Sequence, residues 1–210
     1  MKRAVGILMA VLVAHVAGSC FAQGSNAPAA KQEEKKTAAT QQQNTVVLIK
    51  TSMGNIKVEL FDTQAPETVK NFLQYVDAKF YEGTIFHRVV DTALIQGGGF
   101  TKELVEKPAK QPIKNEASVD RKNLRGTIAM ARKDKPDSAT CQFFINVMDN
   151  DRIFDKDTAQ DKIGYCVFGK VIEGMDVVDK IKSVKTGGHG RFKKELPIED
   201  VIIKEVSRVK

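Results

Sequence analysis

From residue 46 onward the chain is a succession of short apolar segments separated by turn-forming residues, and this pattern limits the folds it can adopt. The segments that read as strands are 46–50, 56–60, 84–90, 94–96, 127–131, 142–147, 165–171 and 201–206. Breaks fall at Gly97-Gly98-Gly99, Lys135-Pro136-Asp137 and Asn150-Asp151. We interpret the glycine run as a close-packed turn. Many short strands of this kind predict an antiparallel barrel or sandwich.

Two segments have helical rather than strand-like periodicity. Pro66 suits a first helical turn, and an apolar stripe at i, i+3, i+4 and i+7 follows it: Val69, Phe72, Leu73 and Val76. A second, shorter helix fits Met175, Val178 and Ile181. The sequence therefore predicts a mainly β domain with two helical caps. Segments 155–163 and 186–197 are interpreted as long loops.

The first 22 residues resemble a secretory signal peptide. Lys2 and Arg3 precede an apolar stretch over 4–18, and small residues before a cut after Ala22 complete the pattern. This predicts a periplasmic protein with a polar, disordered linker at 23–44 and one domain at 45–210.

Two alternatives to cleavage after Ala22 stay open. An uncleaved anchor is disfavoured because the apolar run is short for a bilayer. Acylation of Cys20 would instead make a lipoprotein, and only then do we expect the protein to be attached to a membrane.

Charge and composition exclude some partners. Cleavage after Ala22 removes two basic residues and no acidic one, so the net charge falls from +7 to +5. No dense basic stripe is present, so we expect no nucleic-acid partner. We expect a monomer. Cys141 and Cys166 both lie in apolar runs, and both interpretations, buried thiols or a disulfide, stay open.

Common catalytic motifs are missing. There is no G-x-S-x-G elbow, no glycine loop ending in Gly-Lys-Ser/Thr, and no metal-ligand spacing among the scattered histidines.

A set of motifs in fixed order resembles the cyclophilins over about residues 46–206. The motifs are Pro66 to Phe72 (PETVKNF), Phe86 to Val89 (FHRV), Leu94 to Phe100 (LIQGGGF), Gly126 to Arg132 (GTIAMAR), Ser138 to Asn146 (SATCQFFIN) and Tyr165 to Val171 (YCVFGKV). The resemblance implies a closed eight-stranded antiparallel barrel capped by two α-helices, with a peptide groove on its outside. It also implies peptidyl-prolyl cis-trans isomerisation without cofactor, metal or covalent intermediate, on proline-containing unfolded or partly folded polypeptides.

The resemblance assigns roles to individual residues. Arg88 and Gln96 are the expected catalytic pair, with Arg88 acting on the proline nitrogen. His87 is interpreted as structural, since isomerisation removes no proton. The expected substrate-binding residues are Phe144, Gln142, Leu94, Met130, Ala131, Phe154 and Tyr165. Core packing is an alternative for both Phe144 and Met130.

Two departures from the family pattern affect the pocket. Asp91-Thr92-Ala93 stands where the family has Pro-Gly-Phe, so Ala93 removes a large apolar contact; this motivates an alternative function as a weakly catalytic or non-catalytic peptide-binding chaperone. Ile153 falls where many members have an aromatic residue, which argues against strong cyclosporin binding.

Overall fold

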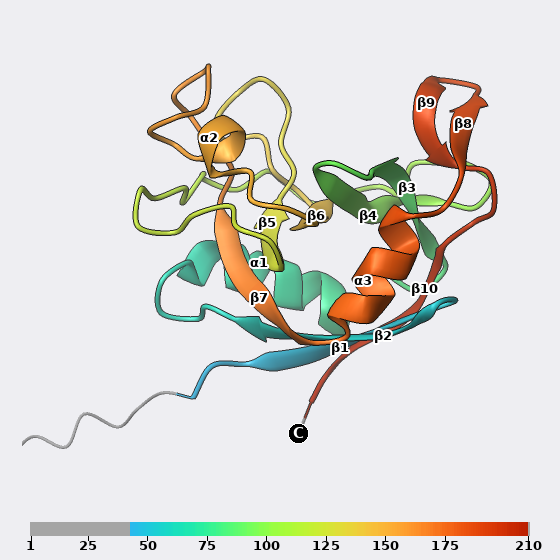
Figure 1. Ribbon diagram of the computed structural model, residues 1–210. Helices are drawn as coiled ribbons and strands as arrows, with labels where there is room; N and C mark the ends of the chain where they lie inside the picture. Colours follow the sequence, from blue (N-terminus) through green and yellow to red (C-terminus); the bar gives the residue numbers. More distant parts are fainter. Residues whose placement is uncertain (1–42, 210) are drawn as a thin grey trace, which may run out of the picture. The chain divides into compact units, whose positions relative to one another are not determined.

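The computed structural model describes residues 43–209 (Figure 1). The predicted signal peptide and nearly all of the predicted linker lie outside these residues. Near the start of the described residues, the Thr45 backbone N–H and hydroxyl donate to the Asp62 carboxylate at 2.7 and 2.9 Å. None of the helices within the described part of the chain combines the length and apolarity that a membrane span requires.

Eight strands close into an antiparallel barrel, which confirms the predicted fold. Their order around the barrel is β1-β10-β3-β4-β6-β5-β7-β2. The strands are β1 (Val46–Thr51), β2 (Gly54–Leu60), β3 (Thr84–Val90), β4 (Leu94–Thr101), β5 (Thr127–Met130), β6 (Phe143–Asn146), β7 (Val167–Glu173) and β10 (Ile202–Arg208). Alternation along each strand sends one set of side chains into the barrel and the other outward.

Aromatic rings fill much of the barrel interior. Phe72 lies 5.6 Å from Phe143 and 5.2 Å from Phe168, measured between ring centroids, and Tyr81 lies 5.4 Å from Phe143. All four side chains are almost completely buried. Edge-to-face contacts of this kind add to the area that the rings bury, so the interior is a packed core and leaves the outer face for binding.

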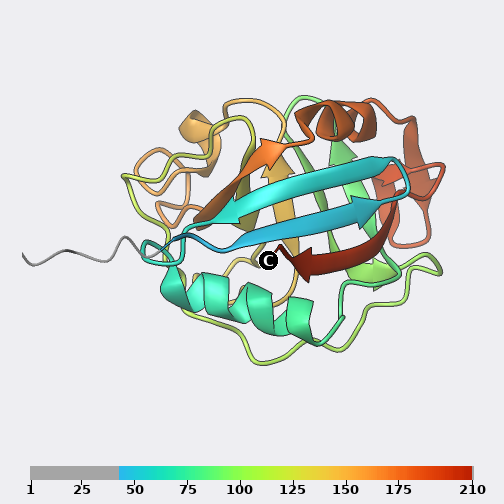
Figure 2. The same cartoon turned by 90° about the horizontal axis from the view of Figure 1, so that it is seen from below.

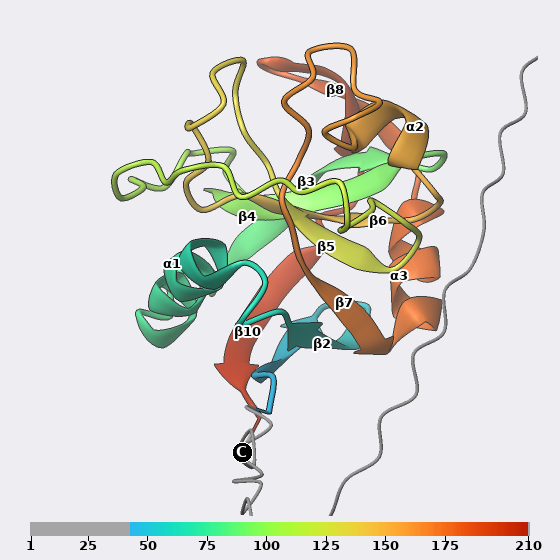
Figure 3. The same ribbon diagram turned by 90° about the vertical axis from the view of Figure 1, so that its left-hand side faces the viewer.

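The two predicted helices close the barrel from opposite sides. They are α1 (Pro66–Asp77) and α3 (Met175–Lys182), and Figures 2 and 3 show the barrel between them. Their apolar stripes, including Phe72 and Ile181, join the barrel interior in one core. A third, one-turn helix, α2 (Asp151–Phe154), lies in the connection between β6 and β7.

The prediction that Gly97 to Gly99 form a close-packed turn is correct about the packing and wrong about the turn. Gly97 to Gly99 lie inside β4, where the pairing with β3 is irregular. Gly98 has φ +84°, and a Cβ there would come within 2.8 Å of the Tyr81 ring and 2.9 Å of the Phe143 ring. The glycines thus let β4 cross the aromatic core closely.

The predicted loop at 186–197 is instead a two-stranded sheet. Strands β8 (Thr186–His189) and β9 (Phe192–Pro197) pair with each other and stay outside the barrel. In Figure 1 this hairpin stands beside the β3 and β4 end of the barrel.

We predict that Gly98→Ala destabilises the domain more than Gly83→Ala. Both glycines have positive φ, which costs a residue with a Cβ about 1–2 kcal/mol, but Gly83 has open space around it. Overpacking against Tyr81 and Phe143 should add roughly 1–3 kcal/mol for Gly98→Ala only. Denaturant unfolding of both variants measures the difference. Equal losses would show that the aromatic contacts do not limit this position.

Candidate active site

One row of side chains crosses the outer face of the barrel and brings together distant parts of the sequence. In the strand register Arg88 faces Gln96, Gln96 faces Phe144, Phe144 faces Ala129, and Ala129 faces Val167. Residues directly opposite each other on paired strands share a face of the sheet. The register therefore places a cation, an amide and an apolar surface side by side.

A β-bulge turns Arg88 into this row. Phe86 pairs with Gly97 and Arg88 with Gln96, so β3 advances two residues where β4 advances one, and His87 is the extra residue. In a regular strand Phe86 and Arg88 would point to the same face. The bulge separates them, because Phe86 is fully buried in the core while Arg88 is half-exposed outside.

Hydrogen bonds link the polar end of the row. The Arg88 Nη1 donates to Gln96 Oε1 at 3.4 Å, and Gln96 Nε2 donates to Gln142 Oε1 at 3.0 Å. On its other edge, Arg88 Nε donates to Glu195 Oε2 at 2.8 Å. Three of the predicted polar residues therefore form one chain, and sequence reasoning missed Glu195.

The apolar end is a compact cluster on the outer face. Phe144 packs there with Leu94, Ala129 and Val167, and it is only 2% exposed. Two further rings border it: the Phe154 and Tyr165 centroids lie 5.7 and 5.4 Å from that of Phe144. Ala93 and Ala131 also pack against the cluster as partly buried residues. The cluster therefore combines aromatic rings with small side chains on the outer face of the barrel.

The structure places Met130 in the interior of the barrel. Met130 pairs with Phe143, an interior residue, and belongs to the barrel core rather than to the outer cluster. Ala129 takes the outward position one residue earlier. Met130 is therefore a core residue, the alternative stated above, and the other predicted residues lie on or beside the row.

A buried network of amides supports the loop that carries Phe154. Asn123 donates from its backbone and its side chain to Asp155 Oδ1 at 2.7 and 2.8 Å. Asn146 Nδ2 donates to Asn123 Oδ1, and Asn150 Nδ2 donates to Asn146 Oδ1 and to the Ala93 carbonyl. Hydrogen bonds between buried polar groups are strong and fix a local geometry. This network ties the turn before β4 to the apolar cluster.

Arg132 covers Tyr165 on the rim. Its guanidinium carbon lies 4.6 Å from the centroid of the Tyr165 ring, and it forms an ion pair with Asp161. The sequence pattern gave no sign of this contact, because it joins two loops that are distant along the chain.

The two cysteines of the domain are both buried and unpaired with each other. Burial raises the pKa of the Cys166 thiol, and its Sγ lies 3.4 Å from the Thr68 hydroxyl. The sequence was compatible with buried thiols or with a disulfide, and the structure contains two buried thiols.

His87 is buried beside Arg88 and is not available as a base. Its ring lies 4.6 Å from Phe100 and 5.7 Å from Phe192. Burial, together with the nearby positive charges of Arg88 and Arg191, lowers the pKa of His87 from 6.5 to about 4. The site thus offers a fixed cation and amide donors, but its histidine stays neutral.

Comparison with known proteins agrees with this geometry. The family described as cyclophilin type peptidyl-prolyl cis-trans isomerase matches residues 46–207. The peptidyl-prolyl cis-trans isomerase B of Escherichia coli is 53% identical over 162 residues, covering 77% of this chain and 98% of the relative. A peptidyl-prolyl cis-trans isomerase of Acinetobacter baylyi is 51% identical over 170 residues, covering 79% of this chain and 89% of the relative.

A solved structure is also similar. The crystal structure of a cyclophilin type peptidyl-prolyl cis-trans isomerase from Cryptosporidium parvum matches with a TM-score of 0.64 and 27% identity, covering 80% of this chain and 98% of the other. The same protein in the presence of the dipeptide Ala-Pro matches with a TM-score of 0.63, 27% identity, and coverage of 79% and 99%.

We predict that His87 makes the domain less stable in acid. Its folded pKa of about 4 lies below the ordinary 6.5, so between these pH values the unfolded chain binds a proton that the folded chain does not. Stability should fall by roughly 3 kcal/mol in total as pH drops through this window. Unfolding free energy against pH measures the slope, and His87→Phe should reduce it. An unchanged slope in that variant would assign the acid sensitivity to other groups.

Proposed function

This chain belongs to the cyclophilin-type peptidyl-prolyl cis-trans isomerases, and we propose that Arg88 is the residue that stabilises the transition state of the isomerisation. We also propose that the substrates of the protein are exported polypeptides. The proposed role of Arg88 is supported by the row in which Arg88, Gln96 and Phe144 lie side by side on the outer face of the barrel.

Rotation about an X–Pro bond is slow because C–N resonance must be lost. The barrier is about 18–20 kcal/mol, and unaided exchange takes roughly tens to hundreds of seconds. In the twisted state the proline nitrogen becomes pyramidal and its lone pair can accept a hydrogen bond that the planar amide cannot. A donor aimed at that nitrogen therefore stabilises the transition state more than the ground state.

Arg88 is suited to this role by its chemistry and its placement. A guanidinium stays charged and holds its N–H groups in a rigid fork. Gln96 contacts it on one side, and the Phe144 surface lies next to Gln96 in the row, within reach of the same bound dipeptide. A proline ring on Phe144 puts its nitrogen on the side from which Arg88 approaches. Gln142, bonded to Gln96, is proposed to bind the peptide backbone.

A purely peptide-binding function is the second candidate, and Ala93 is its motivation. Ala93 packs against the apolar cluster as a partly buried residue, and Ile153, which precedes Phe154 in the chain, is 61% exposed. The pocket therefore has rings at Phe154 and Tyr165 but none on the Ala93 side. A weaker hold on proline would lower catalysis while peptide binding survives.

Export is supported by the pattern of the first 22 residues and by the polar segment that follows it. We propose that the protein acts in the periplasm as a monomeric folding helper. The first 22 residues include Cys20, and acylation of Cys20 would attach the protein to a membrane by its N-terminus.

We predict that Arg88→Ala abolishes most of the isomerase activity while the domain stays folded. Loss of the donor should slow exchange by about a hundredfold or more. NMR exchange between the cis and trans forms of a short X–Pro peptide measures the rate, with Lys170→Ala, an exposed cation elsewhere on the barrel, as the control.

Full activity in Arg88→Ala would contradict the proposed role of this residue. If the unaltered protein binds proline peptides but does not accelerate them, the peptide-binding function is favoured, and Ala93→Phe then tests whether the missing ring is the cause.

For localisation, we predict that the mature protein isolated from its own cells begins at Gln23. The intact mass of that protein measures the cleavage site. A mass that corresponds to a lipid-bearing Cys20 would contradict the soluble periplasmic form, and a mass that includes residues 1–22 would contradict cleavage altogether.

A further inference from the structure

Arg88 is held on a second edge by a residue from outside the barrel. Its Nε donates to Glu195 Oε2 at 2.8 Å, and the two side chains are 43% and 29% exposed. Glu195 lies in β9, in the hairpin that sequence reasoning took for a loop. Charge-assisted hydrogen bonds of this length are among the stronger polar contacts in proteins.

The two contacts of Arg88 occupy two of its three guanidinium nitrogens. Glu195 takes Nε, Gln96 takes one hydrogen of Nη1, and within residues 43–209 Nη2 has no hydrogen-bond partner. A guanidinium is planar, so fixing Nε and Nη1 also fixes the direction of Nη2. Nη2 is therefore the guanidinium nitrogen left for a substrate.

The backbone at Glu195 departs from regular structure in a way that serves this contact. Gly187 pairs with Leu196 and His189 with Phe192, so β9 contains two more residues than β8 between these pairs. Glu195 lies in that bulge with φ +69°, a left-handed conformation that residues with a Cβ rarely adopt. Disfavoured backbone of this kind often accompanies function.

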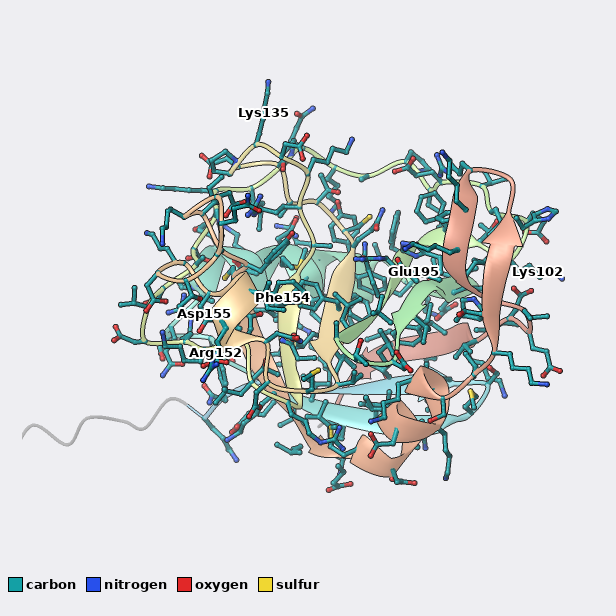
Figure 4. The ribbon with its side chains drawn as sticks, turned by 45° about the horizontal axis from the view of Figure 1, so that its top comes forward. Lys102, Lys135, Arg152, Phe154, Asp155 and Glu195 are labelled. Carbon is teal, nitrogen blue, oxygen red and sulfur yellow. The ribbon has the colours of Figure 1, made fainter. Side chains whose placement is uncertain are left out.

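Two irregularities in two separate sheets therefore meet in one ion pair. The bulge at His87 turns Arg88 out of the barrel, and the bulge in β9 includes Glu195. Figure 4 shows Glu195 on the side of the hairpin that faces the barrel, whereas Lys102 lies beyond the hairpin on its other side.

Apolar contacts, rather than the ion pair, hold the hairpin in place. Leu196 is buried with Ile85 and Phe100, and the Phe192 ring lies 5.2 Å from that of Phe100. Arg191 also lies over Phe100, with its guanidinium carbon 4.3 Å from the ring centroid. Removing the Glu195 carboxylate should consequently leave the hairpin docked.

We propose that Glu195 is a positioning residue of the isomerase. It holds Arg88 by Nε so that the unpaired Nη2 stays directed at the bound X–Pro bond. This inference rests on the proposed role of Arg88. The carboxylate does not touch the substrate; it limits the rotation of a long side chain that is half in solvent, where a single 3.4 Å contact with Gln96 is a weak restraint.

The test compares kcat and KM for Glu195→Ala, Glu195→Gln and Glu199→Ala, with the X–Pro peptide as substrate. Glu199 is an exposed glutamate that follows the same hairpin and makes no ion pair among the described residues. Loss of orientation should lower kcat about three- to tenfold in Glu195→Ala with less than a twofold change in KM. Glu195→Gln, whose amide oxygen can still accept from Nε, should recover part of the rate, and Glu199→Ala should be unchanged.

A double-mutant cycle separates positioning from a merely structural role. In the Arg88→Ala background, Glu195→Ala should have no further effect on the residual rate, because its only action is through the guanidinium. A structural role would instead lower the rate by the same factor in both backgrounds and would lower the denaturant midpoint.

An unchanged or increased kcat in Glu195→Ala would overturn the inference, and an increase would show that the carboxylate restrains Arg88 from acting. Failure of the proposed function looks different: Arg88→Ala itself would keep full activity, whatever the Glu195 variants do.

Discussion

Phe86 and Arg88 are two residues apart in β3, yet the first lies in the barrel core and the second on its outside, because His87 is inserted between them as a bulge. A small barrel fills its interior with side chains, so only the outer face can bind a peptide. The bulge is what brings a permanent cation to that face without removing a large ring from the core. The rest of the site follows from the register: Gln96 and Phe144 lie next to Arg88 because they are its successive partners across β4 and β6.

Two supporting contacts from the connections between barrel strands complete the site. Buried amides of Asn123 and Asn146, with Asp155, hold the loop that brings Phe154 against Phe144. On the other side, the β8–β9 hairpin brings Glu195 to Arg88. The apolar and the cationic ends are thus each stabilised by a connection, not by the barrel alone. Such connections commonly vary within a fold while the scaffold stays the same, so they are natural places to adjust the activity.

The sequence predicted the barrel strands and both caps because those patterns are local: alternation in 56–60 and the stripe beginning at Val69 need no knowledge of partners. It was wrong where the structure depends on register. The glycines at 97–99 are a strand irregularity and not a turn, because their conformation is set by pairing with β3 and by the rings beneath them. The hairpin at 186–197 was missed because its polar Thr-Gly-Gly-His strand has no apolar alternation. Glu195 could not be found, since 107 residues separate it from Arg88.

Catalysis as proposed requires a proline ring on Phe144 while Arg88 donates to the prolyl nitrogen. A crystal structure of the protein with an Ala-Pro dipeptide would test this arrangement. We expect the proline ring on Phe144 beside Phe154 and Tyr165, Nη2 of Arg88 directed toward the prolyl nitrogen, and Nε still bonded to Glu195. A dipeptide bound elsewhere on the barrel, or an Arg88 whose Nε and Nη2 are both bonded to Glu195, would be incompatible with the proposed mechanism.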